Sequence, residues 1–192
     1  MITKTSKPLY VIGIGASAGG LKALQSLVSG LNKNTNCSYV VAQHLSTNHE
    51  SNMVNLLAKY TEVPIKTAEN GVRLSADVIY VCPENANIVI ESGHILLTPP
   101  EDSQTAVPSI NSLFESIAHE SKDRAMGVIL SGVGSDGAEG AKSIIANNGQ
   151  IIAQDLHSAQ YDGMVKATMN ATQVNHFVSP QKIGDLLTTI TT

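Results

Sequence analysis

Three polar residues that together can transfer an acyl group each come after an apolar segment of the chain: Ser17, His44 and Asp136. A serine hydroxyl is a weak nucleophile until a positioned base takes its proton. Imidazole suits that task, and a carboxylate behind it fixes the tautomer and stabilises the cation that forms. The order of the three along the chain is no objection, because such a triad is defined by its geometry. These residues point to acyl transfer with a serine nucleophile.

Glycines stand beside two of these residues. Gly19 and Gly20 follow Ser17 and would let the start of the next helix approach a reacting carbonyl group. Free backbone N–H groups from Ala18 onward could then form an oxyanion hole. Glycines also stand on both sides of Asp136, which favours a loop shaped for close approach.

Each residue also has a purely structural interpretation, which the sequence leaves open. A serine just before a helix is most often an N-cap, and Asp136 could cap the helix expected from residue 138 in the same way. His44 could be a hydrogen-bonded surface residue at the end of a strand. His157 follows a different strand and is the alternative candidate for the base.

Other classes of site fit the sequence less well. Residues 13–18 match a dinucleotide-binding fingerprint, but this match is weak by itself. Such a site needs an acidic residue at the end of the second strand, where this chain has Ala42, Gln43 and His44. The P-loop motif is absent, and His44 and His49 are five residues apart, which does not place them on one helical face for a metal. We therefore expect no metal and no organic cofactor.

Apolar runs alternate with amphipathic segments along most of the chain, which predicts strands alternating with helices. We expect strands over 10–14, 38–42, 63–67, 78–82, 126–130, 151–154 and 175–178. We expect helices over 19–31, 50–60, 109–120, 138–147, 163–170 and 180–189. Two further strands, 87–91 and 94–98, flank the Ser92-Gly93 turn and predict a β-hairpin.

The strands are apolar throughout rather than alternating, which is typical of a parallel sheet covered on both faces. We therefore predict an α/β fold with a doubly wound, mainly parallel sheet, helices on both faces and the β-hairpin at one edge. Sites in such folds form beyond the carboxyl ends of the strands, where the strand order reverses. A triad then requires the strand before Ser17 to lie between the strands before His44 and Asp136.

Length, charge and cysteine content argue against several classes of protein. The 192 residues suit one domain, and we expect residues 1–8 and 190–192 to be frayed ends. The net charge is −4 and the basic residues are dispersed, so nucleic-acid binding is not expected. No apolar run approaches the ~20 residues of a membrane span. Cys37 and Cys82 are too few for a disulfide framework, so we expect them to be buried and unreactive in a cytoplasmic chain.

Three segments resemble the signatures of the CheB family, the protein-glutamate methylesterases of bacterial chemotaxis: 15–20 (GASAGG), 43–44 (QH) and 134–137 (GSDG). The similarity extends over about residues 9–187. The resemblance implies a doubly wound fold and hydrolysis of glutamate methyl esters, with deamidation of some glutamines, on the cytoplasmic helices of chemoreceptors. It also implies that no cofactor is needed.

By the same resemblance, Ser17 would be the nucleophile, His44 the base and Asp136 the residue that orients the base. Ala18, Gly19 and Gly20 would form the oxyanion and substrate loop together with Val133 and Gly134.

The chain departs from the family pattern at several positions. Ala18, Val133 and Ser135 stand where the family usually has Thr, Met and Asn, which resembles the branch fused to a methyltransferase and sensor modules. Asn111 and Val165 replace an expected Asp and Pro, which puts substrate docking in doubt. One alternative is therefore a catalytically weak partner-binding module of a multidomain sensory protein.

The position of the first strand bears on regulation. This strand is expected to start at residue 10, which leaves no room before it for the receiver domain that regulates well-known members of the family. We expect either an excised catalytic domain or regulation from elsewhere.

Overall fold

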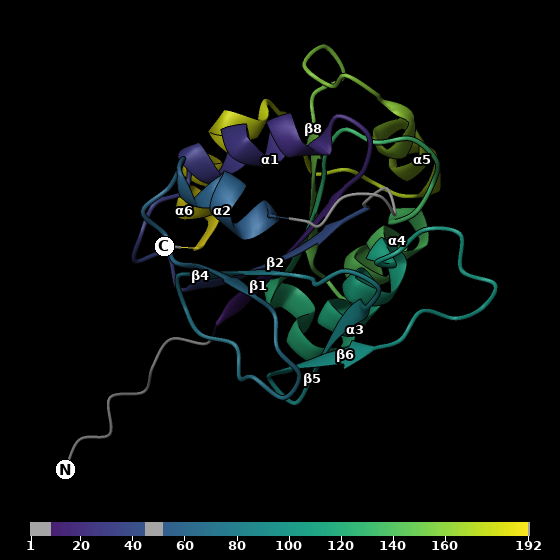
Figure 1. The fold of residues 1–192 in the computed structure, drawn as a ribbon. Coiled ribbons are helices and arrows are strands. Elements are labelled where there is room, and N and C mark those ends of the chain that lie inside the picture. Colours follow the sequence, from purple (N-terminus) through teal and green to yellow (C-terminus); the bar gives the residue numbers. More distant parts are fainter. Residues whose placement is uncertain (1–8, 45–51, 192) are drawn as a thin grey trace.

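A seven-stranded parallel sheet forms the centre of the computed structural model, which describes residues 9–44 and 52–191 (Figure 1). Its strand order is β3-β4-β2-β1-β7-β8-β9, and every neighbouring pair is parallel. The strands are β1 (Tyr10–Ala16), β2 (Cys37–Gln43), β3 (Ile65–Thr67), β4 (Val78–Val81), β7 (Ala125–Ile129), β8 (Gln150–Gln154) and β9 (His176–Val178). The order reverses between β1 and β7, so the sheet is doubly wound.

Helices cover both faces of the sheet (Figure 1). One face carries α1 (Gly20–Ser29), α2 (Met53–Ala58) and α6 (Pro180–Thr191). The other carries α3 (Ile110–Ser121), which is followed by a 3-10 turn (Lys122–Arg124), together with α4 (Ala138–Ala146) and α5 (Gly163–Ala171).

Successive strand residues alternate between the two cores that these helices cover. Val11 of β1 packs toward α3, whereas Ile12 and Ile14 pack toward α1. Because both faces are buried, the strands are apolar throughout, and the predicted fold class is confirmed.

The predicted hairpin is present as β5 (Asn87–Glu91) and β6 (His94–Thr98). Its predicted place at an edge of the main sheet is wrong, because the hairpin forms a separate two-stranded sheet that lies beside α3 (Figure 1). The reason is packing: Ile88 and Ile90 are buried in the same core as α3, and the Ile90 N–H donates to Ser116 Oγ at 3.0 Å.

Two glycines of β1 face α3 and allow it to lie close to the sheet. A Cβ at Gly15 would lie 2.6 Å from Cγ2 of Ile110, and one at Gly13 would lie 2.9 Å from Cδ1 of Ile117. Larger residues would therefore displace α3. The glycines bring the N-terminus of α3 next to the carboxyl end of β1.

The predicted elements are present with ends shifted by a few residues, as is usual for sequence-based boundaries. α6 continues through Thr191, beyond the predicted end of this helix at residue 189. Residues 1–8, 45–51 and 192, which include the expected start of the helix at 50, lie outside the described residues. None of the helices within the described ranges is long and apolar enough to cross a membrane.

Candidate active site

The carboxyl ends of three neighbouring strands bring the predicted triad together. β1 pairs with β2 on one side and with β7 on the other. Ser17 follows β1, His44 follows β2, and Asp136 lies in the loop after β7, so the predicted strand order is confirmed. All three residues line one cleft of about 670 Å³. This cleft lies where the strand order reverses, the usual place for a site in such folds.

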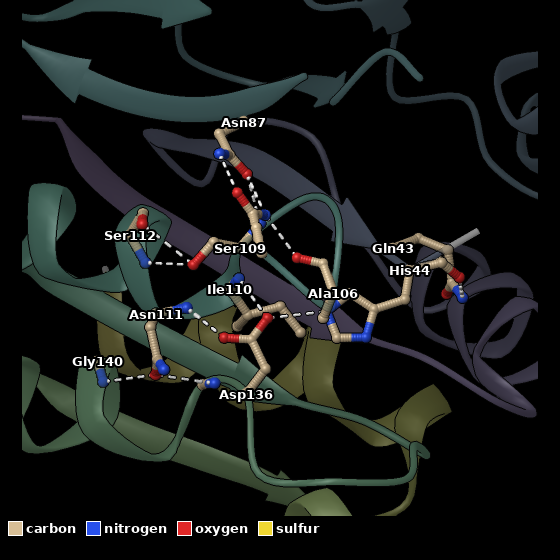
Figure 2. Close-up of polar contacts among 12 residues, drawn as sticks. Gln43, His44, Asn87, Ala106, Ser109, Ile110, Asn111, Ser112, Asp136 and Gly140 are labelled. Atoms are coloured by element: carbon tan, nitrogen blue, oxygen red, sulfur yellow. Dashed lines mark hydrogen bonds and ion pairs between the residues drawn. The ribbon is translucent and has the colours of Figure 1, made fainter. Parts of the chain in front are cut away.

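His44 and Asp136 form a direct side-chain pair. His44 Nε2 lies 2.8 Å from Asp136 Oδ2 (Figure 2). The two side chains are 14% and 15% exposed, so they are shielded from bulk water but can be reached from the cleft. When Nε2 donates to the carboxylate, Nδ1 is the ring nitrogen with a free lone pair. His44 can then accept a proton at Nδ1.

The N-terminus of α3 holds Asp136 in place. The Ile110 N–H donates to Asp136 Oδ2 at 2.8 Å, and the Asn111 N–H donates to Oδ1 at 2.9 Å (Figure 2). Burial raises the pKa of this carboxyl, but the hydrogen bonds from His44 and from the two backbone groups outweigh it and lower the pKa of Asp136. Asp136 therefore stays ionised at neutral pH, where it can orient His44 and stabilise its cation.

The side chain of Asn111, which belongs to α3, bonds to the start of α4. Its Oδ1 accepts hydrogen bonds from the Gly137 and Gly140 N–H groups, both at 2.9 Å (Figure 2). Asp136 therefore accepts from backbone N–H groups at the start of α3, beside the Ser109 N-cap, and Asn111 accepts from those at the start of α4. The interpretation of Asp136 as the N-cap of α4 is wrong, because Gly137 occupies that position and the Asp136 carboxylate faces α3.

Ser17 lies three residues before α1 and does not cap it. The N-cap of α1 is Gly19, with a φ of 72° that favours glycine, and no side chain caps the helix. The N-cap interpretation of Ser17 is therefore wrong. Among the described residues, no hydrogen bond joins the Ser17 hydroxyl to His44, although both line the cleft. Such bonds are often long in unliganded enzymes and tighten when substrate binds.

The predicted oxyanion and substrate loop is divided between two sides of Ser17. Gly19 and Gly20 line a groove on one side, whereas Val133 and Gly134 line the main cleft, where the Val133 side chain is exposed. The Gly20 N–H donates to Ser17 O at 2.8 Å, so it is not free to bind an oxyanion.

The remaining predicted oxyanion donors belong to the two residues just before α1. Within the described part of the chain, the N–H groups of Ala18 and Gly19 have no acceptor. They are the free donors of this loop.

The loop between β6 and α3 forms the facing wall of the cleft and includes Ser103 and Thr105. Two side-chain amides fix this wall: Asn87 Nδ2 donates to Gln104 Oε1 at 2.7 Å, and Gln104 Nε2 donates to Asn87 Oδ1 at 2.8 Å. Asn87 Oδ1 also accepts from the Ser109 N–H at 2.7 Å (Figure 2). The wall is therefore held in place by buried polar contacts.

Comparison with known proteins identifies the family. The family model described as CheB methylesterase matches residues 12–187. The chain belongs to the CheB methylesterase family. As a member it is a carboxylic-ester hydrolase of chemotaxis signalling, so the predicted enzyme class is confirmed. Membership of this family favours the esterase over the nucleotide-binding alternative.

Individual relatives agree with this assignment. The chain is 32% identical over 176 residues to a putative protein-glutamate methylesterase/protein-glutamine glutaminase of Leptospira interrogans, covering 91% of both chains. It is 38% identical over 155 residues to protein-glutamate methylesterase/protein-glutamine glutaminase 3 of Paramagnetospirillum magneticum, covering 80% of this chain and 44% of that protein. The chain thus spans about half the length of several curated relatives.

A solved structure supports the CheB fold. The Thermotoga maritima CheB methylesterase catalytic domain is similar with a TM-score of 0.88 at 24% identity, covering 96% of this chain and 100% of that one. The doubly wound sheet is therefore shared with that domain.

The remaining candidates of the sequence analysis lie outside the cleft of this CheB domain. His157 is exposed and does not line it, and Val165 is a fully buried residue of α5. Cys37 and Cys82 are buried free thiols, as predicted, and burial raises the pKa of Cys82 to about 12. Within the described ranges, no group of three or more His, Cys, Asp or Glu residues could hold a metal.

Sequence reasoning missed the polar residues that support the triad. Asn111 was noted only as a departure, and Gln43 only as part of a motif. Ser131 is also buried, its carbonyl O accepts from the Ser17 N–H at 3.0 Å, and its Oγ donates to Ala18 O at 2.8 Å. The available signal was position, since Gln43 and Ser131 are polar residues at the ends of apolar strands.

Proposed function

We propose that this CheB domain hydrolyses glutamate methyl esters on chemoreceptors through Ser17, His44 and Asp136. The observation that carries the proposal is the 2.8 Å pair of His44 and Asp136, which shares one cleft with Ser17 at the reversal of strand order. The names of the relatives pair methylesterase with glutaminase activity, and we extend both activities to this chain.

The chemistry proceeds in two stages. His44 takes the proton of Ser17 Oγ, which attacks the ester carbonyl and forms a tetrahedral intermediate. The N–H groups of Ala18 and Gly19 supply hydrogen bonds for the oxyanion. The C–O bond breaks, His44 gives its proton to the leaving methanol, and an acyl-enzyme remains. Water, activated by His44, then hydrolyses the acyl-enzyme to glutamate; with a glutamine substrate the leaving group is ammonia.

The lining of the cleft fits a neutral side chain better than an anionic one. Its described lining residues include the uncharged Ser103, Thr105, Asn111 and Ser135, and Asp136 is the carboxylate among them. A glutamyl ester or a glutamine carries no charge, whereas the product is a carboxylate that Asp136 repels. The exposed Ser103, Thr105 and Ser135 leave the cleft open to a side chain presented by a folded helix.

The cellular setting of the domain belongs to the same proposal. Its substrates would lie on cytoplasmic receptor helices, which makes the cytoplasm the expected location. The departures at Ala18, Val133 and Ser135 support the branch in which the esterase is fused to methyltransferase and sensor modules.

Methanol release from methylated receptor membranes tests the activity. Ser17→Ala removes the nucleophile while the backbone contacts of residue 17 remain, so we expect a folded protein with no methanol release above background. Ser29→Ala, at the exposed end of α1, is the matched control and should keep full activity. Wild-type turnover by Ser17→Ala would contradict the proposal.

A further inference from the structure

Gln43 joins the backbones of two proposed catalytic residues that follow different strands. It is the last residue of β2 and is only 8% exposed. Its Nε2 donates to the carbonyl O of Ser17 at 2.8 Å and to that of His44 at 2.9 Å. We propose that Gln43 is a positioning residue that sets the relative placement of nucleophile and base. This inference rests on the proposed function.

The side-chain oxygen of Gln43 indicates that stability alone does not explain a polar residue at this position. Gln43 Oε1 is buried and has no hydrogen-bond partner within the described part of the chain. An unpaired buried acceptor lowers stability, whereas an apolar side chain of similar shape would avoid that loss. Both N–H donors of the Gln43 amide therefore bond to the proposed catalytic residues, although its unpaired oxygen lowers the stability of the fold.

Gly20 provides the space for this amide. A Cβ at Gly20 would lie 2.4 Å from Gln43 Oε1 and 2.8 Å from the Cβ of Ala16. Gly20 has no positive φ, so alanine there meets no backbone strain as the first residue of α1. The conflict is with the amide and with Ala16, which gives a second way to disturb Gln43.

Ser131 holds the nucleophile loop from the other side, but it does not contact His44. Its carbonyl O and Oγ bond to the Ser17 N–H and to Ala18 O, respectively. Among the described side chains, Gln43 alone bonds to the backbones of both Ser17 and His44. Loss of its donors should change their relative placement while the walls of the cleft stay in place.

Catalysis depends steeply on such placement, since a displacement of about 1 Å can reduce the rate by ~10²-fold. Gln43→Met keeps a similar volume and removes both donors. We expect kcat to fall by about 10²-fold with KM unchanged, because the cleft wall that binds substrate is untouched. The thermal unfolding midpoint should stay within a few degrees of wild type, because the unpaired acceptor is removed as well.

Gln154→Met is the matched control. Gln154 ends β8, is 2% exposed, and bonds to the Ser131 N–H and to Ser158 Oγ, so it contacts neither Ser17 nor His44. It should lose at least as much stability as Gln43→Met with a much smaller loss of kcat. A wild-type kcat in Gln43→Met, or equal kcat losses in the two variants, would overturn the inference.

A double-mutant cycle covers the case in which Gln43→Met does not fold. Gly20→Ala should lower kcat by displacing the amide, and in a Gln43→Asn background, where the shorter side chain has already lost both bonds, it should add little. Additive losses would overturn the inference.

Ser17→Ala separates the two proposals: if it is inactive while Gln43→Met and Gly20→Ala are fully active, only the positioning role fails. If Ser17→Ala is active, the proposed function fails.

Discussion

Asp77 and Asp136 lie at opposite ends of the parallel sheet and are held in similar ways. Asp77 precedes β4, and its Oδ1 accepts from the Thr35 N–H at 3.0 Å and from Thr35 Oγ1 at 3.1 Å. Asp136 follows β7 and accepts from two backbone N–H groups of α3. Both carboxylates thus satisfy backbone donors that the adjoining elements leave free.

The difference lies in the next partner along each network. Thr35 Oγ1 also lies 3.0 Å from the hydroxyl of Tyr39, both residues are buried, and burial raises the pKa of Tyr39. The Tyr39 hydroxyl in that network is buried, and its raised pKa keeps it protonated near neutral pH. Asp136 instead contacts His44, which lines a cleft. A carboxylate held in the same way therefore bonds to a loop at one end of the sheet and to the proposed base, His44, at the other.

Replacing each carboxylate by its amide should give the largest contrast. Asp136→Asn cannot stabilise a His44 cation and can hold the wrong tautomer, so we expect methanol release to fall by up to ~10⁴-fold, the loss known for the equivalent change in the serine-protease template. Asp77→Asn should keep kcat and lower only the free energy of unfolding. Turnover of receptor ester by the two variants measures the contrast.

Stability must be measured beside activity for this comparison to hold. Urea unfolding of both variants shows whether each is folded under the assay conditions. The comparison fails if Asp77→Asn, while folded, loses as much kcat as Asp136→Asn.

The lowered pKa of Asp136 predicts a smaller effect on acid stability. A carboxyl with a folded-state pKa below its unfolded value of about 3.9 stabilises the fold above that pH, and this contribution is lost as the pH falls through the folded-state pKa. Wild type should therefore exceed Asp136→Asn in free energy of unfolding at pH 7, and the difference should shrink toward pH 3. Urea unfolding at several pH values tests this, and a difference that grows on acidification would contradict it.

The fold followed from the sequence because local patterns and global architecture agree. Apolar strands alternating with helices permit few arrangements other than a doubly wound sheet. The hairpin was placed wrongly because its pattern shows that two strands pair but not what lies beneath them. Its packing on α3 depends on Ile88 and Ile90, whose partners are distant in sequence.

The proposed catalytic residues were also visible in the sequence, whereas the residues that hold them in place were not. Ser17, His44 and Asp136 are recognisable because their types match a reaction. Gln43 and Asn111 act through backbone groups of other elements, and a polar side chain that bonds to backbone leaves no spacing pattern. Only the register of β1 with β2, and the close approach of α3 and α4, reveal these contacts.

The smallest expected effect concerns Asn111, where the family resemblance led us to expect Asp. Asn111→Asp keeps an acceptor for the Gly137 and Gly140 N–H groups, and its charge interacts favourably with the start of α4, by about 0.3–1 kcal/mol. The new charge also lies next to Asp136, whose Oδ1 already bonds to the backbone of residue 111, and like charges raise the pKa of a carboxyl. The two effects oppose each other, so we expect stability at pH 7 within about 1 kcal/mol of wild type and kcat within a few-fold. The acid loss of stability should begin at a higher pH than in wild type.

Asn111→Ala removes the acceptor altogether and should cost about 1–3 kcal/mol, so equal losses in the two variants would show that the bonds to α4 do not hold the Asp136 loop.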